Sequence, residues 1–264
     1  MGDQPRGHEV GERLFIAGDS VLHRMPAHLK IISMLLTLLV VVATPGRFYW
    51  AFAGYALLVA ALVAVARIPV ATLLSRMVVE IPFVVFALLM PFFGSGPRVE
   101  VGPLSLSEAG LLAAWTLLAK ATTGVAMSIV LGATTTTSQM VEGLRRMHLP
   151  DLLVQIFASM VRYVHVVSAE AARMSRARRA RGFTATGPRA WPVLGRSLGT
   201  LFIRSYERGE RVHLAMLSRG YTGTMPVLHP PQAASPATAA AAAAPPVFAA
   251  TVLAAATAAA GTFA

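Results

Sequence analysis

Long hydrophobic blocks alternate with polar stretches along this chain. Four apolar runs, each with at most one charged side chain, fill the first half at residues 31–44, 50–66, 77–93 and 109–133. Their length and character predict transmembrane helices, although the first two are short of the ~20 residues that cross a bilayer upright. Lys30 is the last charged residue before the first apolar run. An Ala-rich run at residues 247–263 predicts a fifth span.

The segments between these runs are rich in turn formers. Residues 67–76 and the Gly/Pro/Ser-rich residues 94–107 predict loops, and residues 230–246 predict a Pro/Ala-rich linker. Ser107 stands where the fourth apolar run begins, and serine is a preferred N-cap residue because its hydroxyl accepts a hydrogen bond from a free backbone N–H. We therefore expect a helix to start directly after Ser107.

Between the fourth and fifth runs lies a polar segment with helical periodicity. From Asp151, apolar residues recur at every fourth position, at Leu152, Ile156, Met160 and Val164. After Pro192 a second pattern uses Leu194, Leu198, Leu201 and Phe202. Spacing of this kind places the apolar side chains on one broad helix face. The segment therefore predicts two long amphipathic helices.

Both amphipathic helices end in the same short phrase. The two copies, 38 residues apart, read Ala180-Arg181-Gly182-Phe183 and Ser218-Arg219-Gly220-Tyr221. Thr and Pro follow at matching offsets, so we interpret the pair as an internal structural repeat. In each copy the glycine supplies the left-handed position that stops a helix. The plainer alternative is that each Arg only complements the negative helix end, and the shared aromatic and Thr tail argues against it.

Composition and charge fix the class of protein. Of the 264 residues, 55% are hydrophobic and only 13% are charged, which is typical of a polytopic membrane protein. The formal net charge is +11, and 14 of the 23 Lys and Arg residues lie between residues 141 and 225. With the N-terminus in the cytoplasm, these residues all fall inside and only Arg47 and Arg98 fall outside, as the positive-inside rule requires.

These observations predict an all-α, polytopic membrane protein with about five transmembrane helices and two long amphipathic cytoplasmic helices. Residues 1–30 form a polar cytoplasmic segment, and residues 31–137 form transmembrane helices one to four. Residues 138–229 form the cytoplasmic domain, and residues 230–264 form a linker and the last transmembrane helix. This order leaves the C-terminus outside.

Residues for catalysis or for holding a metal or cofactor are not expected here. The sequence has no phosphate-binding Gly-x-x-x-x-Gly-Lys-[Ser/Thr] loop, no Cys, and no His in any predicted span. Two charges fall within the apolar runs. Glu80 is close enough to the inner membrane surface to snorkel. Lys120 lies in mid-span, where it is either functional or paired with Glu80 or a backbone carbonyl.

With these features together, the chain resembles the transmembrane (T) component of energy-coupling factor (ECF) transporters, the CbiQ/EcfT family. Two Ala-Arg-Gly-like phrases at the ends of long cytoplasmic helices identify that family, and the second phrase here departs from it by having Ser218 in place of Ala. The resemblance extends from residues 19–24 through residues 160–163 to the second phrase. Residues 204–212 look like the cobalt-uptake branch of the family.

The resemblance implies a coupling subunit that has no ATPase site of its own. Two ATP-binding-cassette ATPase subunits would dock on the long helices, with Arg181 and Arg219 each entering a groove of one ATPase. The implied coupling residues are Ala180, Arg181, Gly182, Ser218, Arg219 and Gly220, supported by Phe183 and Tyr221. A separate substrate-capturing (S-type) membrane subunit would bring the substrate, cobalt in this branch. The complex would lie in the plasma (inner) membrane of a prokaryote.

Two alternatives remain open, and two others are disfavoured. The chain could be a self-sufficient importer permease that binds its own substrate. Its Arg run, Arg173, Arg176, Arg178 and Arg179, could bind anionic lipid headgroups, with or without a coupling role. A nucleic-acid binder is disfavoured because no aromatic residues are interleaved with this run. A membrane enzyme is disfavoured because the sequence offers no nucleophile with a matching base.

The predicted topology can be tested with reporter fusions. A reporter placed after Arg189 should be cytoplasmic, and one placed in residues 94–107 should be external, because the basic residues hold their segments inside. The opposite pattern would refute the charge argument and would put the Arg-Gly phrases on the wrong side of the membrane.

Overall fold

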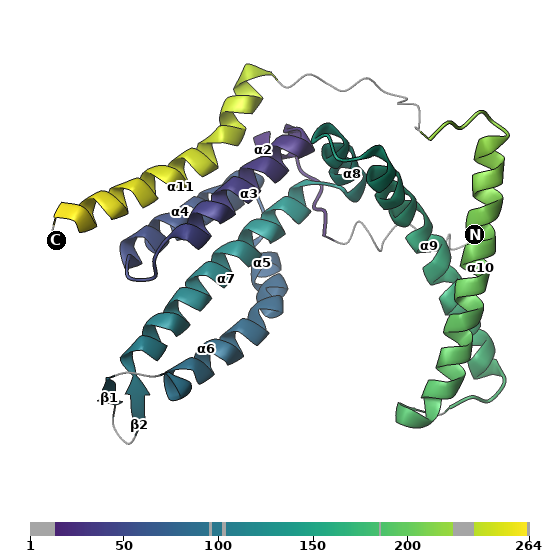
Figure 1. Ribbon diagram of the computed structural model, residues 1–264, viewed down its shortest axis with the longest axis horizontal. Helices are drawn as coiled ribbons and strands as arrows, with labels where there is room; N and C mark the ends of the chain where they lie inside the picture. The colour runs from purple at the N-terminus through teal and green to yellow at the C-terminus, as the bar shows by residue number, and fades with distance from the viewer. Residues whose placement is uncertain (1–13, 95–96, 102–103, 185, 224–234, 263–264) are drawn as a thin grey trace. The chain divides into compact units, whose positions relative to one another are not determined.

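The computed structural model describes residues 14–94, 97–101, 104–184, 186–223 and 235–262. The chain folds as two compact units (Figure 1). We call the described part of residues 13–143 and 232–264 the membrane bundle, and the described part of residues 144–231 the helical hairpin. Each unit is described by itself.

The first part of the chain supplies most of the membrane bundle. Its helices and strands are α2 (Val21–Arg24), α3 (Ala27–Ala43), α4 (Tyr49–Ala66), α5 (Val70–Arg76), the 3₁₀ helix η1 (Met77–Glu80), α6 (Ile81–Phe93), β1 (Arg98–Val101), β2 (Leu104–Ser107) and α7 (Glu108–Thr134). The last helix, α11 (Pro236–Thr262), completes it. Helix α8 (Thr137–Arg146) runs across the boundary between the two units.

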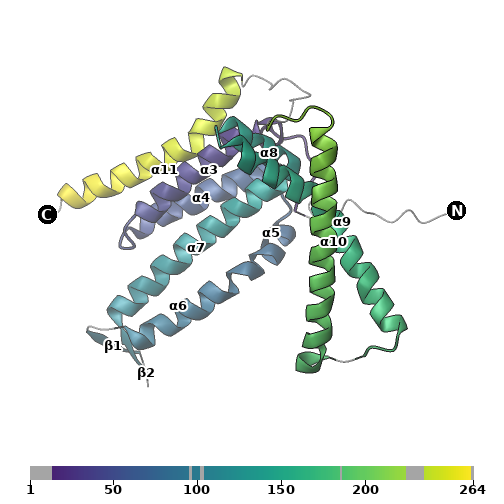
Figure 2. The same ribbon diagram turned by 45° about the vertical axis from the view of Figure 1, so that its right-hand side comes forward.

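The helical hairpin consists of α9 (Asp151–Ala180), the 3₁₀ helix η2 (Gly187–Ala190) and α10 (Trp191–Leu217). These are the two amphipathic helices that the periodicity predicts. Because α9 and α10 are joined by a short connection, they run in opposite directions, and they cross each other (Figures 1 and 2). Pro150 precedes α9 and Pro192 lies in the first turn of α10, where the missing N–H of proline costs nothing.

One hydrophobic cluster joins α3, α4 and α11. Its buried members are Val41, Phe48, Ala51, Phe52, Tyr55, Ala249 and Ala256. The hydroxyl of the buried Tyr55 lies 2.8 Å from Thr44 Oγ1, so the polar end of the ring has a hydrogen-bond partner. Small alanines on α11 allow its backbone to approach the neighbouring helices closely. The C-terminal helix therefore packs within the same bundle as the first helices.

A second cluster joins α4 to α7. Its buried members are Val59, Val63, Ala66, Ile68, Ala126, Met127, Val130 and Ala133. At the end of α7, the ammonium of Lys30 donates to the carbonyl of Thr134 over 2.8 Å and to Thr135 Oγ1 over 3.1 Å. The last carbonyls of a helix lack partners within it, and a cation there also meets the negative end of the helix dipole. Lys30 is therefore part of the bundle's structure.

Helices α6 and α7 meet at a glycine. A Cβ atom added to Gly110 would lie 2.6 Å from the carbonyl oxygen of Met90 and 2.8 Å from Pro91 Cα. Both are backbone atoms, which cannot swing away as the end of a side chain can. Gly110 also donates its N–H to Ser107 Oγ over 3.3 Å, which confirms Ser107 as the N-cap of α7. The start of α7 is thus fixed by a cap and by a close helix contact.

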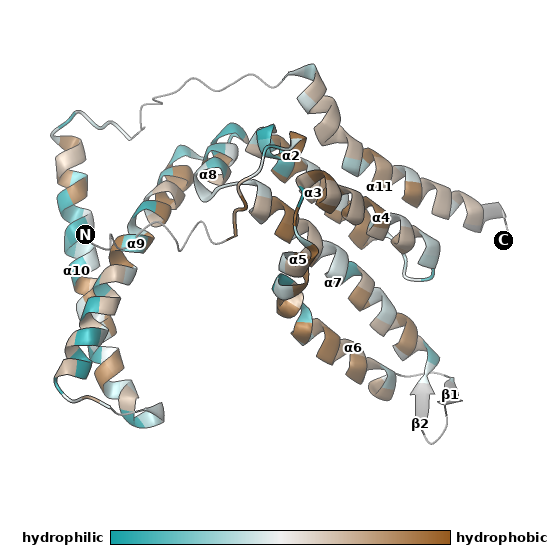
Figure 3. Ribbon diagram, turned by 180° about the vertical axis from the view of Figure 1, so that it is seen from behind, coloured by the Kyte–Doolittle hydropathy of each residue, from teal (hydrophilic) through white to brown (hydrophobic). Residues whose placement is uncertain are grey.

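The outer surface of the bundle is apolar. Large hydrophobic side chains on α6 are exposed, among them Leu88 at 71% and Phe93 at 83%, and Figure 3 shows hydrophobic residues along α6 and α7. Among the described residues, five helices are long and apolar enough to cross a membrane: Tyr49–Ala66, Val70–Phe93, Glu108–Thr134, Asp151–Ala180 and Pro236–Ala259. The chain is therefore an all-α, polytopic membrane protein, as predicted.

The number of candidate spans agrees with the prediction, but their identity differs in two places. Helix α3 has 17 residues and is shorter than the other candidates. Helix α9, which the sequence assigns to the cytoplasmic domain, also has the length and composition of a span. Its first half is apolar and its second half is Arg-rich. The composition of α9 therefore fits a transmembrane span as well as an amphipathic surface helix. The cytoplasmic location of α9 stays a prediction.

Three predicted connections contain regular structure, and these predictions were wrong. Residues 67–76 include α5, which starts after Pro69, and residues 94–107 include the antiparallel strands β1 and β2, with Val99 opposite Leu106. The predicted linker 230–246 overlaps α11, which begins at Pro236. The reason in the last case is the run of alanines after Pro236, because alanine has the highest helix propensity.

Replacing Gly110 with Ala should destabilise the bundle. The new methyl group would press on the backbone of α6, and overpacking of this kind costs ~1–3 kcal/mol. Gly124→Ala on the same helix is the matched control, because the nearest atom to its added Cβ is Leu38 Cδ2 at 3.8 Å. Thermal unfolding in detergent should show a lower midpoint for Gly110→Ala alone. Equal midpoints for the two variants would show that the α6–α7 contact is not close.

Candidate functional site

The first Arg-Gly phrase closes α9 with a specific backbone conformation. Gly182 has φ +75°, in the left-handed region. Its N–H donates to the carbonyl of Arg179 over 3.0 Å, and the N–H of Phe183 donates to the carbonyl of Arg178 over 3.1 Å. This pair of bonds is the Schellman motif, which satisfies carbonyls that the helix itself leaves free. Arg181 is the residue directly before the left-handed glycine.

The second phrase closes α10 in the same way. Gly220 has φ +81°, its N–H donates to the carbonyl of Leu217 over 3.0 Å, and the N–H of Tyr221 donates to the carbonyl of Met216 over 3.0 Å. Arg219 therefore occupies the same place in its motif as Arg181 does in the first. The internal repeat predicted from the sequence is confirmed in the backbone of both helix ends.

Backbone conformation, and not crowding, accounts for the two glycines. An added Cβ at Gly182 or Gly220 would meet nothing within 4 Å. A positive φ is costly for other residues, because their Cβ crowds the following carbonyl oxygen. Each glycine turns the chain away from the helix axis immediately after an arginine. As a result, each arginine stands at the tip of its helix.

Both tip arginines are exposed to solvent. Within the part of the chain that the structure describes, neither Arg181 nor Arg219 forms an ion pair. A guanidinium is always charged and offers five N–H donors in a planar fork, which suits a bidentate contact with a carboxylate. Two such groups, held in the same local geometry, are available for a partner.

The aromatic residues that follow the glycines have different surroundings. The hydroxyl of Tyr221 donates to Gln155 Oε1 in the second turn of α9, and Gln155 Nε2 donates to the carbonyl of Gly223 over 2.7 Å. The ring of Tyr221 also meets His213 edge-on, with 6.4 Å between centroids. Phe183 is partly buried and has no polar group to bond in this way. The second phrase is therefore tied to the beginning of α9.

This tie sets the separation between the two arginines. Tyr221 fixes the second tip beside Gln155, whereas Arg181 follows the last residue of α9. At 1.5 Å per residue, the helix from Gln155 to Arg181 is about 39 Å long. Arg181 and Arg219 thus stand at opposite ends of the hairpin, on the order of 40 Å apart.

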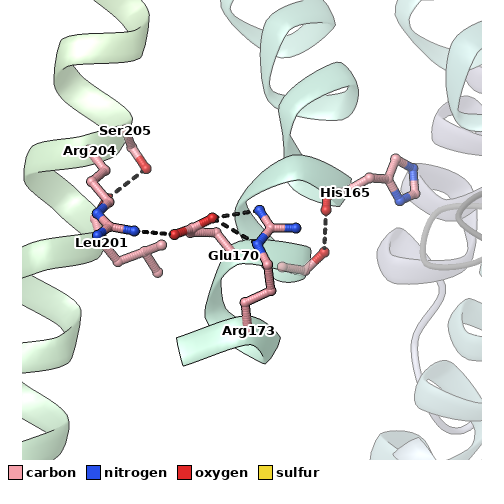
Figure 4. Close-up of polar contacts among 7 residues, drawn as sticks. His165, Glu170, Arg173, Leu201, Arg204 and Ser205 are labelled. Carbon is pink, nitrogen blue, oxygen red and sulfur yellow. Dashed lines mark hydrogen bonds and ion pairs between the residues drawn. The ribbon is translucent and has the colours of Figure 1, made fainter. Parts of the chain in front are cut away.

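A third polar contact joins the two helices midway between the tips. Glu170 of α9 accepts hydrogen bonds from Arg173 one turn further along and from Arg204 of α10 (Figure 4). The Glu170 side chain is 18% exposed, against 55% and 59% for the two arginines. The sequence analysis does not identify Glu170, because a single acid in a helix gives no indication of a partner on another helix.

The two charges within the apolar runs are not paired with each other. Glu80 is buried and accepts a hydrogen bond from Thr122 Oγ1. Lys120 Nζ donates to the carbonyl of Val42 over 2.7 Å, which agrees with the carbonyl alternative. Within the described ranges, no group of three or more His, Cys, Asp or Glu side chains is placed to hold a metal ion.

Comparison with known proteins gives the family. Residues 18–229 match the family described as cobalt transport protein, CbiQ. The chain belongs to this family. The matched region includes the whole helical hairpin up to residue 229, with both Arg-Gly phrases.

Named relatives agree with this assignment. The chain is 30% identical to the cobalt transport protein CbiQ of Rhodobacter capsulatus, over 67% of this chain and 75% of the relative. It is 24% identical to the energy-coupling factor transporter transmembrane protein EcfT of Bacillus subtilis, over 79% and 83%. An uncharacterized protein of Methanocaldococcus jannaschii is 28% identical over 60% of this chain, and the match spans 57% of that protein.

Replacing Gly220 with Ala should weaken the end of α10. Alanine in the left-handed conformation costs about 1–2 kcal/mol, so hydrogen exchange at the last turn of α10 should become faster. Gly209→Ala in the middle of the same helix should slow exchange or leave it unchanged, because alanine is the better helix former and the site is open. Similar effects at both positions would contradict a conformational role for Gly220.

Proposed function

We propose that the chain is the transmembrane scaffold and coupling subunit of an ECF-type ATP-binding-cassette importer for cobalt. In this role it passes the movement of two ATPase subunits to a substrate-capturing membrane subunit. Helices α9 and α10 are the coupling helices, and their tips are the docking points. The family of the chain and the names of its relatives support the transport class and the substrate.

The observation that carries this proposal is the duplication of one tip geometry at two distant places. Arg181 and Arg219 follow the same hydrogen-bonding pattern, point into solvent, and stand on the order of 40 Å apart. One small groove cannot accept both residues. Two copies of the same groove, one on each of two like subunits, can accept one arginine each. The two Arg-Gly phrases then correspond to the two ATPase subunits.

Each helix tip would fit as a rigid projection into a groove of its ATPase. The arginine pairs with a carboxylate in a groove of its ATPase, where the planar guanidinium can form two parallel hydrogen bonds. The glycine then directs the chain out of the groove. Ala180 and Ser218 precede the arginines and are small enough to let the groove close around the tip.

The remaining surface of the hairpin suits contact with the other membrane subunit. Leu152 and Met160 of α9 are exposed at 67% and 60%, and Leu198 and Phe202 of α10 are exposed at 66% and 71%. Exposed apolar residues in a helix stripe are typical of an interaction surface. We assign these faces to the substrate-capturing subunit, so that movement of the tips reaches the substrate.

We further propose that the N-terminus and the coupling helices lie in the cytoplasm of a prokaryote, on the inner face of its plasma membrane. The Arg-rich second half of α9 supports this location, because arginine is disfavoured in the hydrocarbon core and enriched on the cytoplasmic side. ATP hydrolysis then belongs to the partner subunits, and this chain is not itself an enzyme.

A self-sufficient permease fits the membrane bundle less well. A cavity of about 400 Å³ lies between α3, α4, α7 and α11, and its lining is almost entirely apolar. The charged group in that lining is the ammonium of Lys30, which would repel a divalent cation. This environment is suited to hydrocarbon and not to Co²⁺.

Reversing the charge of either tip should weaken assembly with the ATPases. Truncating one half of a buried charge pair at an interface costs ~2–5 kcal/mol, so Arg181→Glu or Arg219→Glu should strongly reduce ATPase co-purification and uptake. Arg→Lys at either tip should have an intermediate effect, because the charge remains but the bidentate geometry is lost. Arg178→Glu, at a partly buried position of the same run, is the control and should have a smaller effect.

The double variant Arg181→Glu with Arg219→Glu gives the clearest outcome. It should still insert in the membrane but lose both ATPase subunits. Normal transport with both ATPases retained would mean that the two phrases are only helix caps.

A further inference from the structure

Glu170 joins α9 and α10, two helices that share almost no hydrophobic core. Val154 is the only described residue of α9 that is buried, and α10 has no buried residue. Added Cβ atoms at Gly195, Gly199 and Gly209 of α10 would meet nothing within 4 Å. The crossing of α9 and α10 is therefore not fixed by interdigitated side chains, and specific polar contacts set its register.

The ion pair of Glu170 lies beside unfilled space. Glu170 and Arg204 line a cavity of about 200 Å³, and its other charged lining residues are Arg208 and the pair Glu207 and Arg211. Arg208 is one helical turn after Arg204, so both guanidiniums extend from the same face of α10. Within the described part of the chain, Arg208 forms no ion pair. Glu170 thus has a second partner available one turn along α10.

We propose that Glu170 is a positioning residue that exchanges Arg204 for Arg208 when α10 slides by one helical turn along α9. This inference rests on the proposed function of the hairpin. Arg173, on the same helix as Glu170, keeps the carboxylate in place in both registers, since its bond does not depend on α10. One-turn shifts of packed elements are a known form of conformational switch, with a step of about 5.4 Å.

The direction of the slide follows from the geometry. Because α9 and α10 are antiparallel, bringing Arg208 opposite Glu170 moves α10 toward the end of α9 that carries Arg181. Arg219 moves with it, and the two tips approach each other by about 6 Å along the hairpin. The same movement separates Tyr221 from Gln155. In the proposed function the two tips are docked on ATPase subunits that move together when they close on ATP. The register in which the tips are nearer, with Arg208 on Glu170, is then assigned to the ATP-bound state.

The register can be read by cysteine cross-linking, because the chain has no native Cys. Counting one turn along each antiparallel helix from the Glu170–Arg204 pair predicts that Met174 lies opposite Leu201. Met174→Cys with Leu201→Cys should therefore report the present register, and Met174→Cys with Ser205→Cys the shifted one. Both pairs leave Glu170, Arg204 and Arg208 intact. The cross-links are compared in the whole transporter, without nucleotide and after trapping with ATP and vanadate.

We expect the 174–201 cross-link to dominate without nucleotide and the 174–205 cross-link to dominate after trapping. Adding Glu170→Gln should remove this dependence on nucleotide. Arg208→Gln should keep both ATPases bound but reduce uptake about tenfold, a typical size for coupling between sites. Arg196→Gln is the control, because Arg196 is an exposed arginine of the same helix that does not line this cavity, so its loss should leave uptake unchanged.

The outcomes separate this inference from the function on which it rests. If wild-type chain carries two active ATPases but the ratio of the cross-links does not respond to nucleotide, the register exchange is wrong and the coupling role stands. Normal uptake in Arg208→Gln would also overturn the exchange. If the wild-type chain carries no ATPases, the proposed function fails and the inference fails with it.

Discussion

The left-handed turn that ends each long helix is the constraint on which the site depends. A helix leaves its last carbonyls without hydrogen-bond partners. In both α9 and α10 a Schellman motif supplies N–H donors for two of these carbonyls. That motif requires positive φ at one position, which Gly182 and Gly220 provide. Because the chain then leaves the helix axis, the residue before the glycine becomes a tip. The position of Arg181 and Arg219 is thus a consequence of backbone hydrogen bonding.

The two units are stabilised by different means, and the difference fits the roles proposed for them. In the membrane bundle, helices meet through clusters of small and branched residues and through a glycine contact at Gly110 that leaves no space for a methyl group. In the helical hairpin, Glu170 and the Gln155–Tyr221 pair connect helices that bury almost nothing against each other. Tightly packed interiors resist displacement, whereas a few polar contacts can exchange partners. The hairpin is therefore the part suited to move.

Sequence patterns predicted the elements that depend on local chemistry. Helical periodicity identified α9 and α10, the Arg-Gly phrases identified their ends, and Ser107 identified the start of α7. These features depend on neighbouring residues, so the sequence contains them directly. The class of membrane protein followed from apolar runs for the same reason. The family assignment, which rested on the two phrases, is confirmed by the match over residues 18–229.

Contacts between distant residues could not be predicted in this way. Lys30 was interpreted as the charge that precedes a span, yet it binds carbonyl and hydroxyl groups more than 100 positions away. Glu170 was overlooked because its partner Arg204 lies on another helix. Residues 94–107 were predicted as a loop from their Gly, Pro and Ser content, yet β1 and β2 pair there over four residues on each strand. In each case the missing information is which segments meet in space.

The central claim is that Arg181 and Arg219 engage two separate ATPase subunits, and site-specific photo-crosslinking tests it most directly. Benzoylphenylalanine can replace Phe183 and Tyr221, the aromatic residues next to the two tips, singly and together in the assembled transporter. The account predicts that each single variant forms an adduct with one ATPase, and that the double variant forms an adduct of this chain with two. Adducts limited to one ATPase in the double variant, or adducts with lipid alone, would contradict it.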